Sequence, residues 1–446
     1  MTNGIKKRQF ARDVIGTFLT KVVLIVLKTS LGIVTARILG PAGRGLFYTS
    51  AQCAGLANTV GTFSVGEALI YYIGEGRLER RRMFGSILGM VFAFTAILWT
   101  ILYLVLPWLQ ETVLRNYDEN LIVFVFALMP GMMLEYFSSS ALRGLRVFRV
   151  ANTMTIVTRT ILLVFVAGAL LIVSADVYIG VAAFTVGIWV NALIYVVVLY
   201  LQGDRNRGVD WRRYGSILKY GGATHIGTLL TEVEYRLDAF ILLYFLNAAA
   251  VGIYSIGVTI SQMLWYVSNS INTVLFPHLA ASKDEDRNIV AAKMLKHSLY
   301  ANGMVALGLV VAAYPLIRVL YGSAFTEAYG VFLVLAPGLL SDSVGRSLAV
   351  WLKGRGKPLM MSWSSAASLV LNVGLNFAFI PSYGIYGAAL ASSISYSFRA
   401  AILLVLFYRH TRISLKTMFL FEADELKEAV KVIRAALARR RGCYSS

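Results

Sequence analysis

Twelve charged residues, six basic and six acidic, lie inside strongly apolar stretches of this sequence. Charged side chains are costly inside a membrane, so they usually mark a functional site or an ion pair. A lysine or arginine there can bind an anionic group, and a carboxylate can take up a proton or a cation. The basic residues are Lys21, Lys28, Arg159, Arg236, Arg346 and Arg399, and the acidic residues are Glu67, Glu135, Glu232, Glu234, Asp238 and Asp342.

The spacing of some of these charges indicates shared helix faces. Lys21 and Lys28 are two helical turns apart, and no acidic residue lies in the same apolar stretch. Glu232 and Arg236 have the i,i+4 spacing of a helical ion pair. That pair could hold helices together, or Glu232 or Asp238 could instead bind H+ or Na+. The spacing leaves both interpretations open.

The composition is that of a membrane protein. Hydrophobic residues make up 58% of the chain, charged residues make up 15%, and the mean hydropathy is +0.68. Soluble domains carry roughly 25% charged residues. The apolar residues form runs of about twenty, the length that crosses a bilayer as a helix. A large soluble helical core would instead show polar stripes and shorter apolar runs.

The sequence favours neither a metal-dependent function nor nucleic-acid binding. Cys53 and Cys443 lie far apart, and the four histidines form no cluster with them, so we expect no disulfide and no metal site. The net charge of +19 would suit a nucleic-acid partner. The basic residues gather at the ends of the apolar stretches rather than on one soluble face, so we expect no nucleic acid to bind.

The charge pattern predicts twelve membrane spans with both termini in the cytoplasm. Segments on the N-terminal side hold 32 Lys and Arg residues, and loops on the other side hold only four: Arg37, Arg44, Arg115 and Arg318. Cytoplasmic loops carry this excess in membrane proteins. The predicted spans are 14–36, 45–73, 84–107, 120–141, 151–173, 178–201, 217–246, 250–277, 295–317, 328–352, 359–381 and 384–408.

The basic tail, residues 412–446, is predicted to form an amphipathic helix on the inner membrane surface. Phe419, Leu426 and Val430 are among its regularly spaced apolar residues, and basic residues such as Lys427 and Lys431 lie at other positions. The alternative is a partly disordered tail.

The chain contains two similar halves, residues 1–206 and 207–411, each with six predicted spans. Three pairs of short motifs are separated by the same 207 residues. They are Gly45-Leu46-Phe47 with Gly252-Ile253-Tyr254, Leu128-Met129-Pro130-Gly131 with Leu335-Ala336-Pro337-Gly338, and Tyr178-Ile179-Gly180-Val181-Ala182 with Ile385-Tyr386-Gly387-Ala388-Ala389. An even number of spans per half predicts two six-helix bundles related by a pseudo-two-fold axis along the membrane normal, with a cavity between them.

The matched prolines predict bends within the two halves. Pro130 and Pro337 each remove a helical hydrogen bond, and Gly131 and Gly338 add local freedom. These positions could be kinks that move during a gating cycle, or static kinks that only shape the cavity.

Several longer motifs resemble a known family. They are ARILGPAGRGLFYTS (Ala36–Ser50), YRLDAFILLYFLNAAAVGIYSIGVTIS (Tyr235–Ser261), KGRGKP (Lys353–Pro358) and IPSYGIYGAALAS (Ile380–Ser392). With their order and spacing, the chain resembles the Wzx-type oligosaccharide or polysaccharide flippases of the multidrug/oligosaccharidyl-lipid/polysaccharide (MOP) exporter superfamily over about residues 10–410. The resemblance implies an all-α membrane fold like that of the multidrug (MATE) exporters of the same superfamily.

The resemblance also implies a function. Such flippases move a polyprenyl-diphosphate-linked oligosaccharide from the inner to the outer leaflet of the bacterial cytoplasmic membrane, for O-antigen, capsule or exopolysaccharide synthesis. The partners implied are this lipid, the bilayer, and a polysaccharide polymerase with its chain-length machinery. No cofactor is implied beyond coupling to H+ or Na+. A MATE-type exporter of small molecules is the alternative, and a membrane-embedded polymerase or ligase is disfavoured by the short outside loops.

Under this interpretation the charges inside the spans acquire roles. Lys21, Lys28, Arg236 and Arg399 are the candidates for binding the diphosphate in the cavity. Glu232 and Asp238 are the candidates for binding the coupling cation.

Overall fold

The structure is a computed structural model that describes residues 2–76, 78, 80–202, 211–266, 268–269, 284–355 and 358–420. The regular elements in these ranges are all helices, as the long apolar runs predict. They are α1 (Thr2–Thr62), α2 (Val65–Gly74), α3 (Arg80–Glu111), α4 (Glu119–Gly144), α5 (Phe148–Gly168), the π-helical turn η1 (Ala169–Val173), α6 (Val177–Gln202), α7 (Trp211–Phe245), α8 (Ala248–Ser261), α10 (Asp284–Leu320), the 3-10 turn η2 (Ser323–Phe325), α11 (Ala328–Gly354), α12 (Pro358–Thr411) and α13 (Leu415–Phe419).

Within the described ranges, nine helical stretches are long and apolar enough to cross a membrane. The chain is therefore a multi-pass membrane protein. Helix α7 has 35 residues but is not among the nine, because Glu232, Glu234, Arg236 and Asp238 lower its apolarity.

Helices α1 and α12 each consist of two arms that meet at a glycine. The backbone leaves helical geometry at Gly40 (φ 65°) and at Gly384 (φ 56°), in the left-handed region that glycine enters without a steric penalty. Pro41 follows Gly40 directly and suits the first turn of the second arm. We call the end of the molecule with these two glycines the kink end, and the end where α1 begins the N-terminal end.

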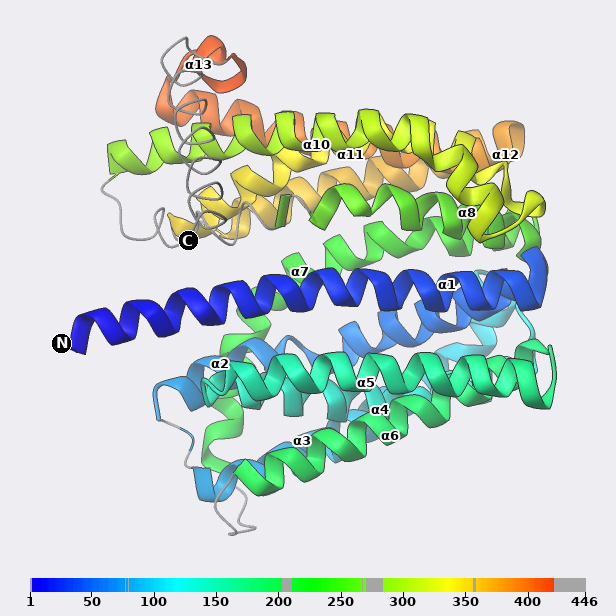
Figure 1. Ribbon diagram of the computed structural model, residues 1–446, viewed down its shortest axis with the longest axis horizontal. Helices are drawn as coiled ribbons and strands as arrows, with labels where there is room; N and C mark the ends of the chain where they lie inside the picture. The colour runs from blue at the N-terminus through cyan, green and yellow to red at the C-terminus, as the bar shows by residue number, and fades with distance from the viewer. Residues whose placement is uncertain are drawn as a thin grey trace, which may run out of the picture.

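The helices form two groups with α1 and α7 between them (Figure 1). One group contains α2–α6, and the other contains α8 and α10–α12. Helix α7 packs against α2 near the N-terminal end and against α12 and α8 further along. An apolar cluster that includes Phe47, Leu121 and Val166 on one side and Leu242 and Val251 on the other joins the two groups toward the kink end.

One predicted span is interrupted. Residues 45–73 were expected to form a single helix, but α1 ends at Thr62 and α2 begins at Val65. Phe63 and Ser64 have positive φ values of 48° and 52°. Helix α7 supports this break, since Ser64 hydrogen-bonds His225 at 3.2 Å and Gly221 leaves no room for a Cβ beside the Phe63 carbonyl oxygen.

The described part of the predicted tail contains only α13. Met418 in this short helix is fully buried, and the Phe419 carbonyl accepts a hydrogen bond of 2.9 Å from the Tyr300 hydroxyl on α10. The predicted amphipathic helix otherwise lies outside the described residues, from 421 onward.

Candidate functional site

Two adjoining cavities lie between the helix groups. Their volumes are about 790 and 390 Å³, and both are lined by Glu232, Tyr235, Tyr266 and Asn269. The larger cavity extends toward the N-terminal end, because its lining residues Lys21 and Met361 are each roughly 30 Å along their helices from the kinks. The smaller cavity lies nearer the kink end. The shared residues make the two cavities one continuous site.

The smaller cavity has a cationic lining. Lys28, Arg44 and Arg236 contribute to it, and Glu232 is the one acidic residue among the described residues that line it. The cations come from three segments: the first arm of α1, the second arm of α1, and α7. Fixed cations around a small polar space are the arrangement that binds phosphate groups.

Lys28 and Arg236 each contact a residue of the other sequence half. The Lys28 ammonium donates to Gln262 Oε1 at 3.2 Å. Arg236 donates through Nη1 to Gln52 Oε1 at 3.1 Å. It also donates to Glu232 Oε2 through Nε at 3.0 Å and Nη2 at 2.8 Å. The predicted ion pair between Glu232 and Arg236 is therefore present.

Arg44 corrects the loop assignment made from charge. Sequence analysis placed it in an outside loop, but it is 6% exposed and lines the smaller cavity. The Gly40–Pro41 turn is so short that Arg44 already belongs to the second arm of α1. Its Nη1 donates to Thr35 Oγ1 at 2.9 Å, whereas its buried Nε has no partner among the described residues. A buried arginine with an unused donor is ready to bind a ligand.

The larger cavity is lined by charges that balance. Lys21, Arg346 and Arg399 contribute positive charge, and Glu67, Glu232 and Asp342 contribute negative charge. Thr228, Thr231 and Ser365 add hydroxyl-bearing side chains to the lining. Lys21 and Lys28, predicted to share one face, thus line different cavities. The balanced lining suits a neutral, hydroxyl-rich group better than an anion.

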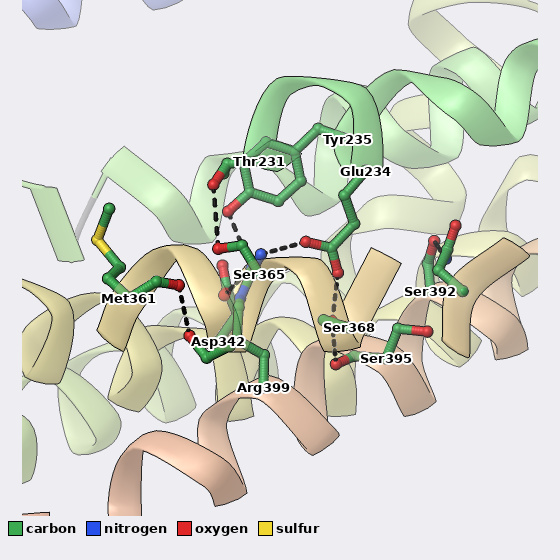
Figure 2. A network of polar contacts seen from close by, with 12 residues as sticks. Thr231, Glu234, Tyr235, Asp342, Met361, Ser365, Ser368, Ser392, Ser395 and Arg399 are labelled. Atoms are coloured by element: carbon green, nitrogen blue, oxygen red, sulfur yellow. Dashed lines mark hydrogen bonds and ion pairs between the residues drawn. The ribbon is translucent and has the colours of Figure 1, made fainter. Parts of the chain in front are cut away.

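Arg399 lies in a buried ionic network that joins α7 to α11 and α12 (Figure 2). Its guanidinium pairs with Glu234 of α7 and, at 2.5 Å, with Asp342 of α11. Its side chain is 6% exposed. Tyr235 accepts hydrogen bonds from Arg346 at 2.7 Å and from Arg399 at 3.0 Å. These contacts join α7, α11 and α12, so Arg399 has a cavity position but two acidic partners.

Asp238 is a buried carboxylate surrounded by neutral donors. It is 4% exposed and accepts hydrogen bonds from Tyr254 at 2.6 Å, from Asn376 at 2.9 Å, and from Ser392. No lysine or arginine of the described chain pairs with it. The Asn376 amide oxygen beside it is buried and has no partner among the described residues. Oxygen ligands of this kind suit Na+, and an unpaired buried carboxylate also suits a proton.

The predicted gating kinks lie inside continuous helices. Pro130 lies within α4 and Pro337 within α11. A Cβ on Gly131 would lie 3.1 Å from the Ile188 side chain of α6, and one on Gly338 would lie 2.4 Å from Ser393 Cα of α12. Both glycines thus permit close packing of equivalent helices, and the gating role remains a prediction.

The site also contains residues that sequence reasoning missed. Arg44, Gln52 and Gln262 were not predicted, although each is a polar residue beside or within an apolar run. Trp265 was also missed, and the Arg346 guanidinium carbon lies 4.2 Å from the centre of its ring. Polar residues inside predicted spans, whether charged or not, are the signal that would have found most of them.

Comparison with solved structures identifies the fold. The chain is similar to the lipid II flippase MurJ in an inward closed conformation, with a TM-score of 0.72 and 14% sequence identity over 96% of each chain. It is also similar to an inward-facing multidrug resistance MATE family transporter of the MOP superfamily, with a TM-score of 0.67 and 14% identity, covering 87% of this chain and 94% of that one. At these identities the likeness concerns the fold alone.

Comparison with sequences identifies relatives. The chain is 22% identical over 377 residues to the "Probable low-salt glycan biosynthesis flippase Agl15" of Haloferax volcanii, covering 81% of this chain and 76% of the relative. It is 22% identical over 390 residues to a Shigella flexneri protein named as an O-antigen transporter, covering 84% of this chain and 92% of the relative. A family model described as polysaccharide biosynthesis protein matches residues 34–329, more than half of the chain. This match agrees with the resemblance to polysaccharide flippases that the sequence motifs indicated. The chain therefore belongs to this polysaccharide biosynthesis protein family.

Proposed function

We propose that this protein is a flippase for a polyprenyl-diphosphate-linked oligosaccharide. It moves the lipid from the inner to the outer leaflet of a bacterial cytoplasmic membrane, supplying O-antigen, capsule or exopolysaccharide synthesis. The observation that carries the proposal is the cationic lining of the smaller cavity by Lys28, Arg44 and Arg236. The names of the two relatives support the same class of function.

The two cavities suit the two parts of such a headgroup. The diphosphate would occupy the smaller cavity, where its oxygens accept hydrogen bonds from the cations. The sugars would occupy the larger cavity, where Thr228, Thr231 and Ser365 offer hydroxyl groups and Tyr235 and Tyr266 offer aromatic faces. A polar path of this kind removes the cost of passing a sugar diphosphate through hydrocarbon.

We further propose twelve spans in two halves related by pseudo-two-fold symmetry, with both termini cytoplasmic. Nine helical stretches of the described chain are already long and apolar. Counting the two arms of α1 and of α12 separately, and adding α7, raises this number to twelve. The shift of 207 residues matches Gly40 with Asn247, between α7 and α8, and matches Gly384 with Val177, the first residue of α6. A kink in one half thus corresponds to a helix boundary in the other.

Asp238 is the favoured site for a coupling H+ or Na+. It lacks a cationic partner in the described chain, whereas Glu232 is paired with Arg236. Uptake of a cation at Asp238 would change its hydrogen bonds to α8 and α12 and so bias the packing of the second group. Coupling of this kind would drive alternating access between the two sides of the membrane.

Export of small molecules is the second candidate, supported by the fold likeness to a MATE transporter. The lining of the smaller cavity favours an anion over the lipophilic cations that a drug exporter of this kind would carry. Depletion of the protein in its host separates the two candidates. We expect a diphosphate-linked oligosaccharide to accumulate on the inner leaflet, unreachable by an impermeant label, with unchanged sensitivity to cationic drugs. Normal outer-leaflet labelling together with increased drug sensitivity would overturn the proposal.

A further inference from the structure

Two hydrogen bonds between the sequence halves, residues 1–206 and 207–411, have the same arrangement. In each, a cation of one sequence half donates to a glutamine oxygen of the other: Lys28 to Gln262 at 3.2 Å and Arg236 to Gln52 at 3.1 Å. All four side chains line the smaller cavity. Gln52 is oriented by its own amide, which donates to the Tyr48 hydroxyl at 2.8 Å.

The two contacts are near-equivalents under the internal repeat. A shift of 207 residues takes Lys28 to position 235, the neighbour of Arg236, and takes Gly55 to Gln262. Gly55 lies three residues after Gln52 and contacts Arg236 so closely that a Cβ there would lie 2.1 Å from Nη1. In each half, one helix carries a cation, and the segment after it contacts the cation of the other half. The contacted residues, Gln52 with Gly55 and Gln262, lie at about the same position of the repeat. Such reciprocity indicates a shared role.

The neutral glutamine side chains hold the cations less strongly than carboxylates would. A carboxylate at either position would form an ion pair and cancel the charge that an anionic ligand needs. An amide oxygen satisfies the donor but remains neutral. Lys28 therefore has no acidic partner among the described residues, and Arg236 has no second carboxylate beside Glu232. Hydrogen bonds with an ionised acceptor are stronger than those with a neutral one, so a diphosphate oxygen can replace the amide.

We propose that Gln52 and Gln262 are placeholder acceptors: they hold Arg236 and Lys28 while the cavity is empty, and an entering diphosphate displaces both. The inference rests on the proposed function. Displacement replaces two direct contacts between the sequence halves with one bridge through the ligand. Binding of the headgroup therefore changes which contacts join the two halves, and so allows the halves to move relative to each other.

The experiment measures binding of farnesyl diphosphate to the purified full-length protein by calorimetry. Gln52→Glu and Gln262→Glu keep the side-chain shape but convert the placeholder into a competing anion. We expect each to weaken binding at least about tenfold. Gln52→Met and Gln262→Met remove the amide without adding charge, so they should bind at least as tightly as the wild type. Gln110→Glu on α3, outside both cavities, makes the same charge change and should leave binding unchanged.

The outcomes separate this inference from the proposed function. If the wild type fails to bind farnesyl diphosphate, the anion site itself is wrong and the inference fails with it. If the wild type binds and the Glu variants bind equally well, only the placeholder role is wrong. Equal weakening by the Met and Glu variants would show that the amides bind the ligand themselves, which also overturns the inference.

Discussion

Gly45 on the second arm of α1 and Gly252 on α8 contact each other through their backbones at the kink end of the molecule. A Cβ on Gly45 would lie 1.7 Å from the Ala248 carbonyl oxygen, and one on Gly252 would lie 2.0 Å from the Pro41 carbonyl oxygen. The two glycines are separated by the 207 residues of the internal repeat. Equivalent residues meet in this way only on a pseudo-two-fold axis, so the contact supports the symmetry expected from the sequence.

The Gly45–Gly252 contact also holds α1 and α8 together at this end. We predict that Gly252→Val separates α1 from α8, because backbone atoms leave no space for the added side chain. A cysteine introduced at the kink end of the cavity should then become reactive to an impermeant maleimide from the outside. Gly303→Val on α10, where nothing lies within 4 Å of a Cβ, is the matched control. Unchanged reactivity in a folded Gly252→Val protein would contradict the prediction.

Arg44 is predicted to be a ligand of the anionic group. Arg44→Met keeps most of the side-chain volume but removes the charge and the unused Nε donor. A hydrogen bond to a charged group contributes about 1.5–3 kcal/mol, so diphosphate binding should weaken by roughly ten- to a hundredfold.

The control for Arg44 is Arg37→Met in the first arm of α1. Arg37 donates to the Leu320 carbonyl at 2.9 Å and lines neither described cavity, so its loss should leave diphosphate affinity unchanged. Equal affinity of the Arg44→Met and wild-type proteins would limit Arg44 to a packing role.

The sequence was sufficient for much of the fold because helix formation here depends on local patterns. Runs of apolar residues marked the helices, and the Gly40–Pro41 pair lies where α1 bends. The repeat motifs make Gly45 and Gly252 equivalent positions, and the structure brings the two into contact. Each of these features can be read within a short window of residues.

The site was harder to predict because its partners come from distant helices. The acidic partners of Arg399, Glu234 and Asp342, come from α7 and α11, so they cannot be read from the sequence around Arg399. Arg44 was misplaced because the charge count treats every basic residue near a turn as a loop residue. Gln52 and Gln262 were not predicted, since an uncharged side chain within an apolar run carries no charge that would mark it. Which side chains meet is decided by helix packing, which local spacing does not encode.

Asp238 is predicted to make transport depend on a cation gradient. Asp238→Asn preserves the side-chain shape, so Tyr254 and Asn376 can still pack against it, but an amide binds neither H+ nor Na+ in the same way. Lipid translocation in vesicles should therefore lose its dependence on an imposed H+ or Na+ gradient. Glu232→Gln should retain that dependence, because Glu232 serves Arg236. Gradient-dependent transport by the Asp238→Asn protein would remove Asp238 from the coupling mechanism.

Arg399 is predicted to contribute more to stability than to substrate binding. Arg399→Met leaves Glu234 and Asp342 buried without this partner, and removal of one member of a buried ion pair costs about 3–5 kcal/mol. Thermal unfolding of the purified protein should show a clear loss, and adding Glu234→Gln to the same chain should restore part of it. If Arg399→Met unfolds like the wild type but no longer binds farnesyl diphosphate, Arg399 is a substrate ligand, as its position in the sequence first suggested.

Lys28→Met is predicted to have the opposite effect. It removes a cavity cation that no acid pairs with among the described residues, so thermal stability should be kept while diphosphate binding is lost.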